Sequence, residues 1–172
     1  MNKQSNTFQG KLVVVTGGGS GIGRETALAF AQRGAEVVLS DVNLDAAKRT
    51  AAMIEDAGGT AHPYELDVAD EAAMHAHADE VAAWHGVPDI LINNAGIGHA
   101  GAFLATPSES FHRVMAINFY GVVSGCRAFG AKMVQRGSGG HIVNLSSMAA
   151  YLPQRSFAAY TTSKAAVFMF SD

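Results

Sequence analysis

The chain has 172 residues, enough for one domain with a substantial hydrophobic core. Its composition, 48% hydrophobic and 16% charged, is that of an ordinary globular protein. A formal net charge of −3 offers no basic surface for nucleic acid, and no apolar run is long enough to span a membrane. The single cysteine, Cys126, excludes an internal disulfide and favours a reducing, cytoplasmic location. Residues 1–9 are polar, lack the apolar stretch of a signal peptide, and are expected to form a flexible N-terminus.

Short apolar segments, several of them rich in β-branched residues, recur along the chain and predict strands. We expect five strands, at residues 12–15, 36–40, 60–65, 89–93 and 141–145. Helical patterns lie between them and after the last, at residues 22–33, 43–57, 70–85, 106–135 and from about 157 to the end. Alternating strands and helices imply crossover connections and a parallel sheet. We therefore predict one α/β domain over residues 1–172, with a Rossmann-type doubly wound sheet and helices on both faces.

Polar residues mark where several of these helices begin. Asn43 can cap the second helix, and Asp70 starts the third. The segment Thr106-Pro-Ser-Glu109 reads as a capping box with proline at the first helical position. The helix that it opens is expected to run unbroken to about Gln135, where a glycine-rich segment follows.

A glycine-rich turn joins the first strand to the first helix, with the sequence Thr16-Gly-Gly-Gly-Ser-Gly-Ile-Gly23. Gly17, Gly21 and Gly23 allow a tight turn, close approach of a ligand and close packing of helix on strand. Backbone N–H groups at the helix start, including those of Ser20 and Ile22, can hold a pyrophosphate. Although such turns are common, the strand-turn-helix context favours a dinucleotide site.

Asp41 lies at the end of the second expected strand, 24 positions after Gly17. An aspartate there can accept hydrogen bonds from the adenosine ribose hydroxyls and would repel a 2′-phosphate. No basic residue follows it directly, and the nearby Arg24 lies inside the first helix. The pattern favours NAD over NADP, the alternative being that Asp41 is only a solvated residue at a strand end.

Tyr160 and Lys164 are four positions apart, so on a helix their side chains point the same way. A free tyrosine titrates near about 10, too high for a base at neutral pH, and a nearby ammonium favours the phenolate. Such a pair can exchange a proton with an alcohol or ketone oxygen. On its own, however, this spacing more often marks an ordinary helix surface.

Four motifs occur together in the order typical of one family. They are Thr16-Gly-x-x-x-Gly-Ile-Gly23, Asn93-Asn-Ala-Gly96, Ile142-Val-Asn-Leu-Ser-Ser147 and Tyr160-x-x-x-Lys164. With them the chain resembles the short-chain dehydrogenase/reductase family from about Gly10 to its last residue. The resemblance implies an NAD-dependent oxidoreductase that transfers a hydride between nicotinamide and a secondary alcohol or ketone.

The resemblance also assigns roles to the catalytic residues. Tyr160 corresponds to the acid/base, and Lys164 to its partner, which also binds the nicotinamide ribose. Ser147, thirteen positions before Tyr160, corresponds to the serine that holds the substrate oxygen, with Ser146 as the second choice. Asn118 resembles the asparagine that supports a proton-relay water, although it could simply bond a backbone carbonyl.

The remaining positions carried over by resemblance bind the cofactor. Asp67 and Val68 resemble the pair beside the adenine ring. A further segment resembles the one that runs along the cofactor: Asn94, Ala95 and Gly96. The family also implies a homodimer or homotetramer, with the last helix at the interface.

No metal site is expected from the sequence. His75 and His77 are two positions apart, so a helix points them in different directions, and no carboxylate or cysteine cluster completes a site. Cys126 falls within a long helix and reads as packing rather than as a nucleophile. Trp84 reads as core or interface.

The chain ends at Asp172, eight residues after Lys164, whereas family members continue with further strands and a substrate-covering region. The fifth strand would then form an apolar sheet edge. We expect the sequence to be part of a longer enzyme. The alternative is a non-catalytic dinucleotide-binding module or an inactive truncated form.

Overall fold

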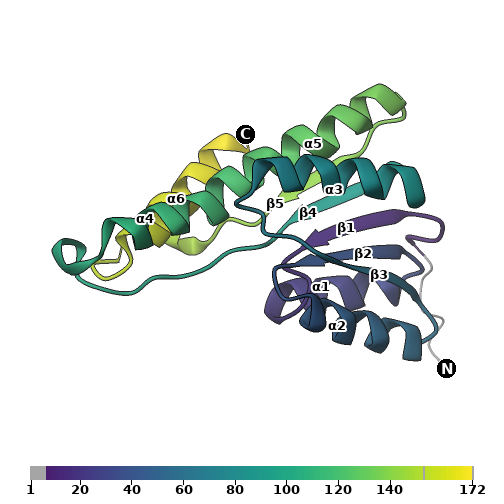
Figure 1. Ribbon diagram of the computed structural model, residues 1–172, viewed down its shortest axis with the longest axis horizontal. Coiled ribbons are helices and arrows are strands. Elements are labelled where there is room, and N and C mark those ends of the chain that lie inside the picture. The colour runs from purple at the N-terminus through teal and green to yellow at the C-terminus, as the bar shows by residue number, and fades with distance from the viewer. Residues whose placement is uncertain (1–6, 153, 172) are drawn as a thin grey trace.

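The computed structural model describes residues 7–152 and 154–171. Within them, five parallel strands form one sheet in the order β3-β2-β1-β4-β5 (Figure 1). The strands are β1 (Leu12–Thr16), β2 (Glu36–Asp41), β3 (Thr60–Glu65), β4 (Ile90–Asn93) and β5 (His141–Asn144). All five lie within a residue of the predicted ranges, and the parallel Rossmann-type sheet is confirmed.

Helices cover both faces of the sheet, and each face has its own apolar cluster. Two helices lie on one face, α1 (Gly21–Ala31) and α2 (Leu44–Asp56), and two on the other, α3 (Glu71–Trp84) and α5 (Gly121–Arg136) (Figure 1). The helices α4 (Ser108–Met115) and α6 (Ala158–Phe170) pack together beside the carboxyl end of the sheet.

The central strand β1 illustrates why this sequence forms a two-sided sheet. All five of its residues are buried, with Val13 and Val15 facing α1 and α2, and Val14 facing α3 and α5. Because both faces of a parallel sheet are covered, a continuous β-branched run is favoured over an alternating one. In the described part of the chain no helix combines the length and apolarity needed to cross a bilayer.

Two predicted helix starts are confirmed and one is wrong. Asn43 Oδ1 accepts a hydrogen bond from Ala46 N–H, and Asp70 Oδ1 accepts one from Ala73 N–H. Thr106 does not cap α4, because its hydroxyl donates instead to the Ala102 carbonyl, in the preceding short 3-10 helix region. Helix α4 begins one residue later than the box predicted, after Pro107, without a side-chain cap.

The long helix predicted from Thr106 is interrupted rather than uniform. Between α4 and α5 lies a π-helical segment, η2 (Ala116–Tyr120), which contains Asn118. Such segments are frequent at functional sites. Gly137, with φ +74°, ends α5 in the left-handed conformation typical of a helix C-terminus.

Three further predictions concern the N-terminal residues, the edge of the sheet and Trp84. Residues 1–6 of the expected flexible segment 1–9 lie outside the described residues, whereas Phe8 packs edge-on against Phe30. Strand β5 forms the sheet edge as expected, with Ile142 and Val143 partly exposed. Trp84 is 77% exposed, so it is not a core residue.

Candidate functional site

The glycine turn between β1 and α1 has a shape that larger residues could not adopt. Gly17 and Gly21 have φ of +65° and +52°, which glycine tolerates and L side chains rarely do. A Cβ on Gly23 would lie 2.1 Å from the Gly17 carbonyl oxygen. The backbone at the start of α1 is therefore open to a ligand because these positions lack side chains.

Asn94 fixes this turn to the end of β4. Its Nδ2 donates to the carbonyls of Thr16 (2.8 Å) and Gly17 (3.2 Å). The Thr16 hydroxyl in turn accepts from the N–H groups of Asn94 and Ala95, each at 3.1 Å. The predicted cofactor segment, residues 94–96, is thus bonded directly to the glycine turn.

Asp41 ends β2 and stands beside the turn, as predicted. Its Oδ2 accepts from Gly19 N–H (2.9 Å), and its Oδ1 accepts from Asn43 N–H (2.9 Å). Arg24 Nη2 donates to the Gly19 carbonyl (2.6 Å), and its Nε donates to Thr50 Oγ1. The aspartate is therefore held rigidly, and the nearby arginine is engaged with the backbone of the turn.

Asp67 and Val68 follow β3 on the same side of the sheet. Asp67 Oδ1 accepts from Ala69 N–H (3.0 Å), which shapes the loop, while the Asp67 side chain is exposed. Val68 is buried and lies against Gly121, where a Cβ would come within 2.9 Å of the valine side chain.

Tyr160 and Lys164 lie on adjacent turns of α6. Lys164 Nζ is 6.0 Å from the centre of the Tyr160 ring and donates to the Leu145 carbonyl at 2.6 Å. This bond ties α6 to the end of β5. Burial lowers the pKa of the Lys164 ammonium.

The two candidate serines have different environments. Ser146 Oγ donates to the Lys164 carbonyl (2.8 Å) and lines the pocket described below. Ser147 Oγ accepts from Ala149 N–H (3.1 Å), at the start of the short 3-10 helix η3 (Met148–Ala150). The choice between them as the substrate-binding serine stays a prediction.

Asn118 is fully buried and joins three segments. Its Oδ1 accepts from Ile97 N–H (2.8 Å), and its Nδ2 donates to the Ile97 carbonyl and to Ser163 Oγ. The side chain thus does bond a backbone carbonyl, as the simpler alternative expected. It links η2 to α6 and to the loop after β4.

One pocket of about 630 Å³ brings most of these residues together. Its volume is within the range of small-molecule and cofactor sites. Thirteen of the predicted residues line it: Gly17, Ser20, Gly21, Ile22, Gly23, Asp41, Asp67, Val68, Asn94, Ala95, Gly96, Tyr160 and Lys164. Ser147 and Asn118 are outside this lining.

The pocket also contains residues that sequence reasoning missed. Arg113 of α4 is the charged member of this group, and Ile97 and Leu145 belong to the Tyr160 end. No local motif marks Arg113. Its position in the first turns of the helix expected to begin at Thr106 could have suggested that it faces the loop before that helix.

Comparison with known proteins agrees with this geometry. The family described as short chain dehydrogenase matches residues 11–172. "Probable oxidoreductase EphD" of Mycobacterium tuberculosis is 64% identical over 165 residues, which cover 96% of this chain and 28% of that protein. "D-threitol dehydrogenase" of Mycolicibacterium smegmatis is 38% identical, with 91% of this chain and 60% of that protein covered.

A solved structure gives the same result in three dimensions. A short chain dehydrogenase/reductase from Burkholderia phymatum, in complex with NAD, superposes with a TM-score of 0.92 at 35% identity. The match covers 95% of this chain and 58% of that one, so the present sequence spans only part of the length of its relatives. With a glycine turn, a parallel five-stranded sheet and a family match over nearly its whole length, the chain belongs to the short chain dehydrogenase family.

Proposed function

We propose that the chain binds NAD in preference to NADP and forms the catalytic core of an oxidoreductase that interconverts a secondary alcohol and a ketone. The observation that carries the proposal is the single pocket that joins the glycine turn and Asp41 to Tyr160 and Lys164. The residues from the glycine turn to Lys164 would hold the cofactor, which would supply the hydride acceptor for the alcohol as NAD and the hydride for the ketone as NADH.

The residues at the glycine end fit a dinucleotide. A Cβ at Gly17 would lie 2.9 Å from Ala95 Cα, and one at Gly23 would be closer still to backbone, so the cradle exists only with glycine. The N–H groups at the start of α1 suit a pyrophosphate. The Asp41 carboxylate, held by two backbone N–H groups, favours ribose hydroxyls over a 2′-phosphate.

At the other end, the side chains suit proton transfer. Tyr160 takes a proton from the alcohol oxygen, or returns one to the ketone oxygen, while Lys164 stabilises the phenolate form. The Lys164 ammonium is oriented by Leu145, and Ser147 holds the substrate oxygen. Asn118 keeps the loop after β4 in register with α6.

We also propose self-association as a homodimer or homotetramer through α6. Phe168, Met169 and Phe170 on this helix are between 41% and 72% exposed, although large apolar side chains are usually covered. Light scattering of Met169→Glu beside the unmodified protein tests this, with a smaller assembly expected for the variant. An unchanged mass would count against α6 as the interface.

A panel of secondary alcohols with NAD, followed through NADH absorbance, tests the catalytic proposal. We expect Tyr160→Phe to lower kcat about 1,000-fold, because the phenol carries the proton. NADH affinity should change little, since the ring remains. The matched control is Tyr151→Phe, an exposed tyrosine outside the pocket, which should keep full turnover.

Two results would count against this proposal. If Tyr160→Phe turned over as fast as the unmodified protein, Tyr160 would not be the acid/base. If the protein bound NADH and turned over no alcohol or ketone in the panel, the non-catalytic dinucleotide-binding module would be favoured.

A further inference from the structure

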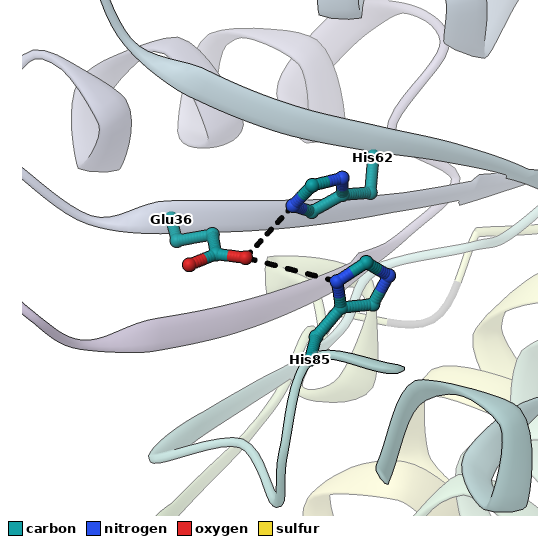
Figure 2. A group of neighbouring side chains, drawn as sticks. All are labelled: Glu36, His62 and His85. Atoms are coloured by element: carbon teal, nitrogen blue, oxygen red, sulfur yellow. Dashed lines mark hydrogen bonds and ion pairs between the residues drawn. The ribbon is translucent and has the colours of Figure 1, made fainter. Parts of the chain in front are cut away.

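Three potential metal ligands meet at the β3 side of the sheet, away from the cofactor pocket. Glu36 begins β2, His62 lies in β3, and His85 follows α3. Glu36 Oε1 is 2.7 Å from His62 Nε2 and 3.7 Å from His85 Nδ1 (Figure 2). Asp41 lies at the other end of β2, five residues or about 17 Å away, so the group is separate from the cofactor site.

The topology of the sheet explains how distant residues converge. In the parallel register Glu36 pairs with Thr60 and Val38 pairs with His62. Side chains two residues apart point to the same face, so Glu36 and His62 both project toward the α3 side, where Val38 contributes to the core. The turn after α3 brings the His85 ring over His62, with ring centres 3.9 Å apart.

We propose that Glu36, His62 and His85 form a binding site for a divalent transition-metal ion, with Zn²⁺ as the favoured occupant. The three ligand atoms all lie within 4.8 Å of one another. Tetrahedral zinc with bonds of about 2.0–2.1 Å places its ligand atoms about 3.3 Å apart. The pairwise separations of the ligand atoms must change by at most about 1.5 Å to reach that spacing, and the metal takes the place of the Glu36–His62 hydrogen bond.

An outer hydrogen bond orients one of the three ligands. Tyr64 Oη is 2.8 Å from His85 Nε2, the ring nitrogen that faces away from Glu36. When a metal binds Nδ1, the Nε2–H donates to this hydroxyl, the kind of outer contact that orients metal-binding histidines.

The chemistry of the three ligands favours zinc over Mg²⁺ and Ca²⁺, and the exposure of their side chains allows an ion to enter. Two imidazoles with one carboxylate suit zinc and its neighbours, whereas Mg²⁺ and Ca²⁺ prefer all-oxygen sites. The side chains of Glu36, His62 and His85 are 42%, 29% and 14% exposed, so an ion can enter from solvent and keep water as a fourth ligand. Bound there, the ion joins β2, β3 and the end of α3, which points to a stabilising role.

Calorimetric titration of zinc into EDTA-treated protein, prepared without a histidine tag, tests the proposal. We expect one zinc ion per chain and a melting temperature that rises with zinc and does not rise with Mg²⁺. His62→Gln and Glu36→Gln should each weaken zinc binding at least about tenfold. The matched control is His75→Gln, an exposed histidine of α3 outside the group, which should bind zinc like the unmodified protein.

Co²⁺ gives a second measurement that does not depend on stability. Its visible absorption reports a four-coordinate nitrogen and oxygen site, and Glu36→Gln, which can keep a hydrogen bond to His62, should lose this spectrum while remaining folded. Equal zinc binding by the unmodified protein, His62→Gln and Glu36→Gln would overturn the proposal, as would the absence of stoichiometric binding. NADH affinity should be the same with and without zinc, so the outcome is independent of the proposed enzyme function.

Discussion

The two halves of the cofactor pocket are built in different ways. At the glycine turn, the shape comes from the backbone, because Gly17 and Gly23 leave no room for a Cβ. At the Tyr160 end, the shape comes from side-chain hydrogen bonds that join separate segments, through Asn118 and Lys164. The glycines that shape the first half lie within one short stretch of sequence, with Asn94 tying that stretch to the end of β4, whereas the second half is formed by bonds between several distant segments.

This difference predicts which perturbations each half tolerates. The glycine-turn half should fail when a Cβ is added at Gly17 or Gly23, and it should be insensitive to changes in the polar residues of the Tyr160 end. A network of side chains should fail when one member is removed, while the cradle continues to bind the adenosine part of the cofactor. ADP-ribose, which lacks nicotinamide, reports on the glycine-turn half alone and can separate the two.

Acid should lower the folding stability of the region around β2, the strand that carries Asp41. His77 bonds Ser40, which precedes Asp41 in β2, and burial together with the nearby His85 lowers the pKa of His77 to about 4. Below pH of about 6.5 the unfolded chain binds a proton that the folded chain does not, so stability falls until the pH reaches about 4. The total loss is about 3 kcal/mol.

Urea unfolding between neutral pH and pH 4, in EDTA, measures this loss. His77→Gln keeps a polar side chain but does not titrate, so its stability should decline less steeply over this window. The exposed His75 provides the control, since His75→Gln should follow the unmodified protein. Parallel curves for His77→Gln and the unmodified protein would show that His77 does not link stability to pH.

Adding one methyl group to the cradle should break the first half directly. In Gly23→Ala the new Cβ would meet the Gly17 carbonyl and Asn94 Nδ2 at 2.1 and 2.5 Å, so the turn must open. We expect ADP-ribose and NADH to bind about 100-fold more weakly, or about 2.7 kcal/mol. Gly130→Ala, in α5 outside the pocket, where a Cβ would meet only Ile142 Cδ1 at 3.5 Å, is the control and should bind both ligands normally.

Removing Asn118 should break the second half and spare the first. Asn118→Ala removes the side-chain partner of the Ile97 N–H and carbonyl, at a cost of about 2 kcal/mol in folding stability, while Ser163 Oγ keeps its bond to the Tyr160 carbonyl. We expect slower turnover with unchanged ADP-ribose affinity. Ser163→Ala keeps both Asn118 bonds to Ile97 and should have a smaller effect. An equal loss of ADP-ribose binding would mean that the two halves are not independent.

Sequence patterns predicted the parts of the molecule that local physics determines. Four of the five strands follow from apolar runs, β3 being the exception, and the starts of α2 and α3 follow from the caps Asn43 and Asp70, which satisfy nearby backbone N–H groups. The glycine turn was predictable for the same reason, since its positive φ values require glycine within a few residues.

The features that were missed depend on residues far apart in the sequence. Thr106 fits the pattern of a helix cap, yet the loop folds so that its hydroxyl meets Ala102 instead. The π segment of η2 has no distinctive local sequence, and Arg113 reaches the pocket only through the packing of α4. Glu36, His62 and His85 are 26 and 23 positions apart, so spacing along one helix could not reveal their convergence.

Competition between NADH and NADPH, measured by fluorescence titration, tests the central claim of an NAD site at the glycine turn and Asp41. We predict that NADH binds at least about tenfold more tightly than NADPH, and that Asp41→Asn, which removes the charge, reduces this difference in affinity mainly by improving NADPH binding. Equal or tighter binding of NADPH by the unmodified protein, or an unchanged ratio in Asp41→Asn, would contradict it.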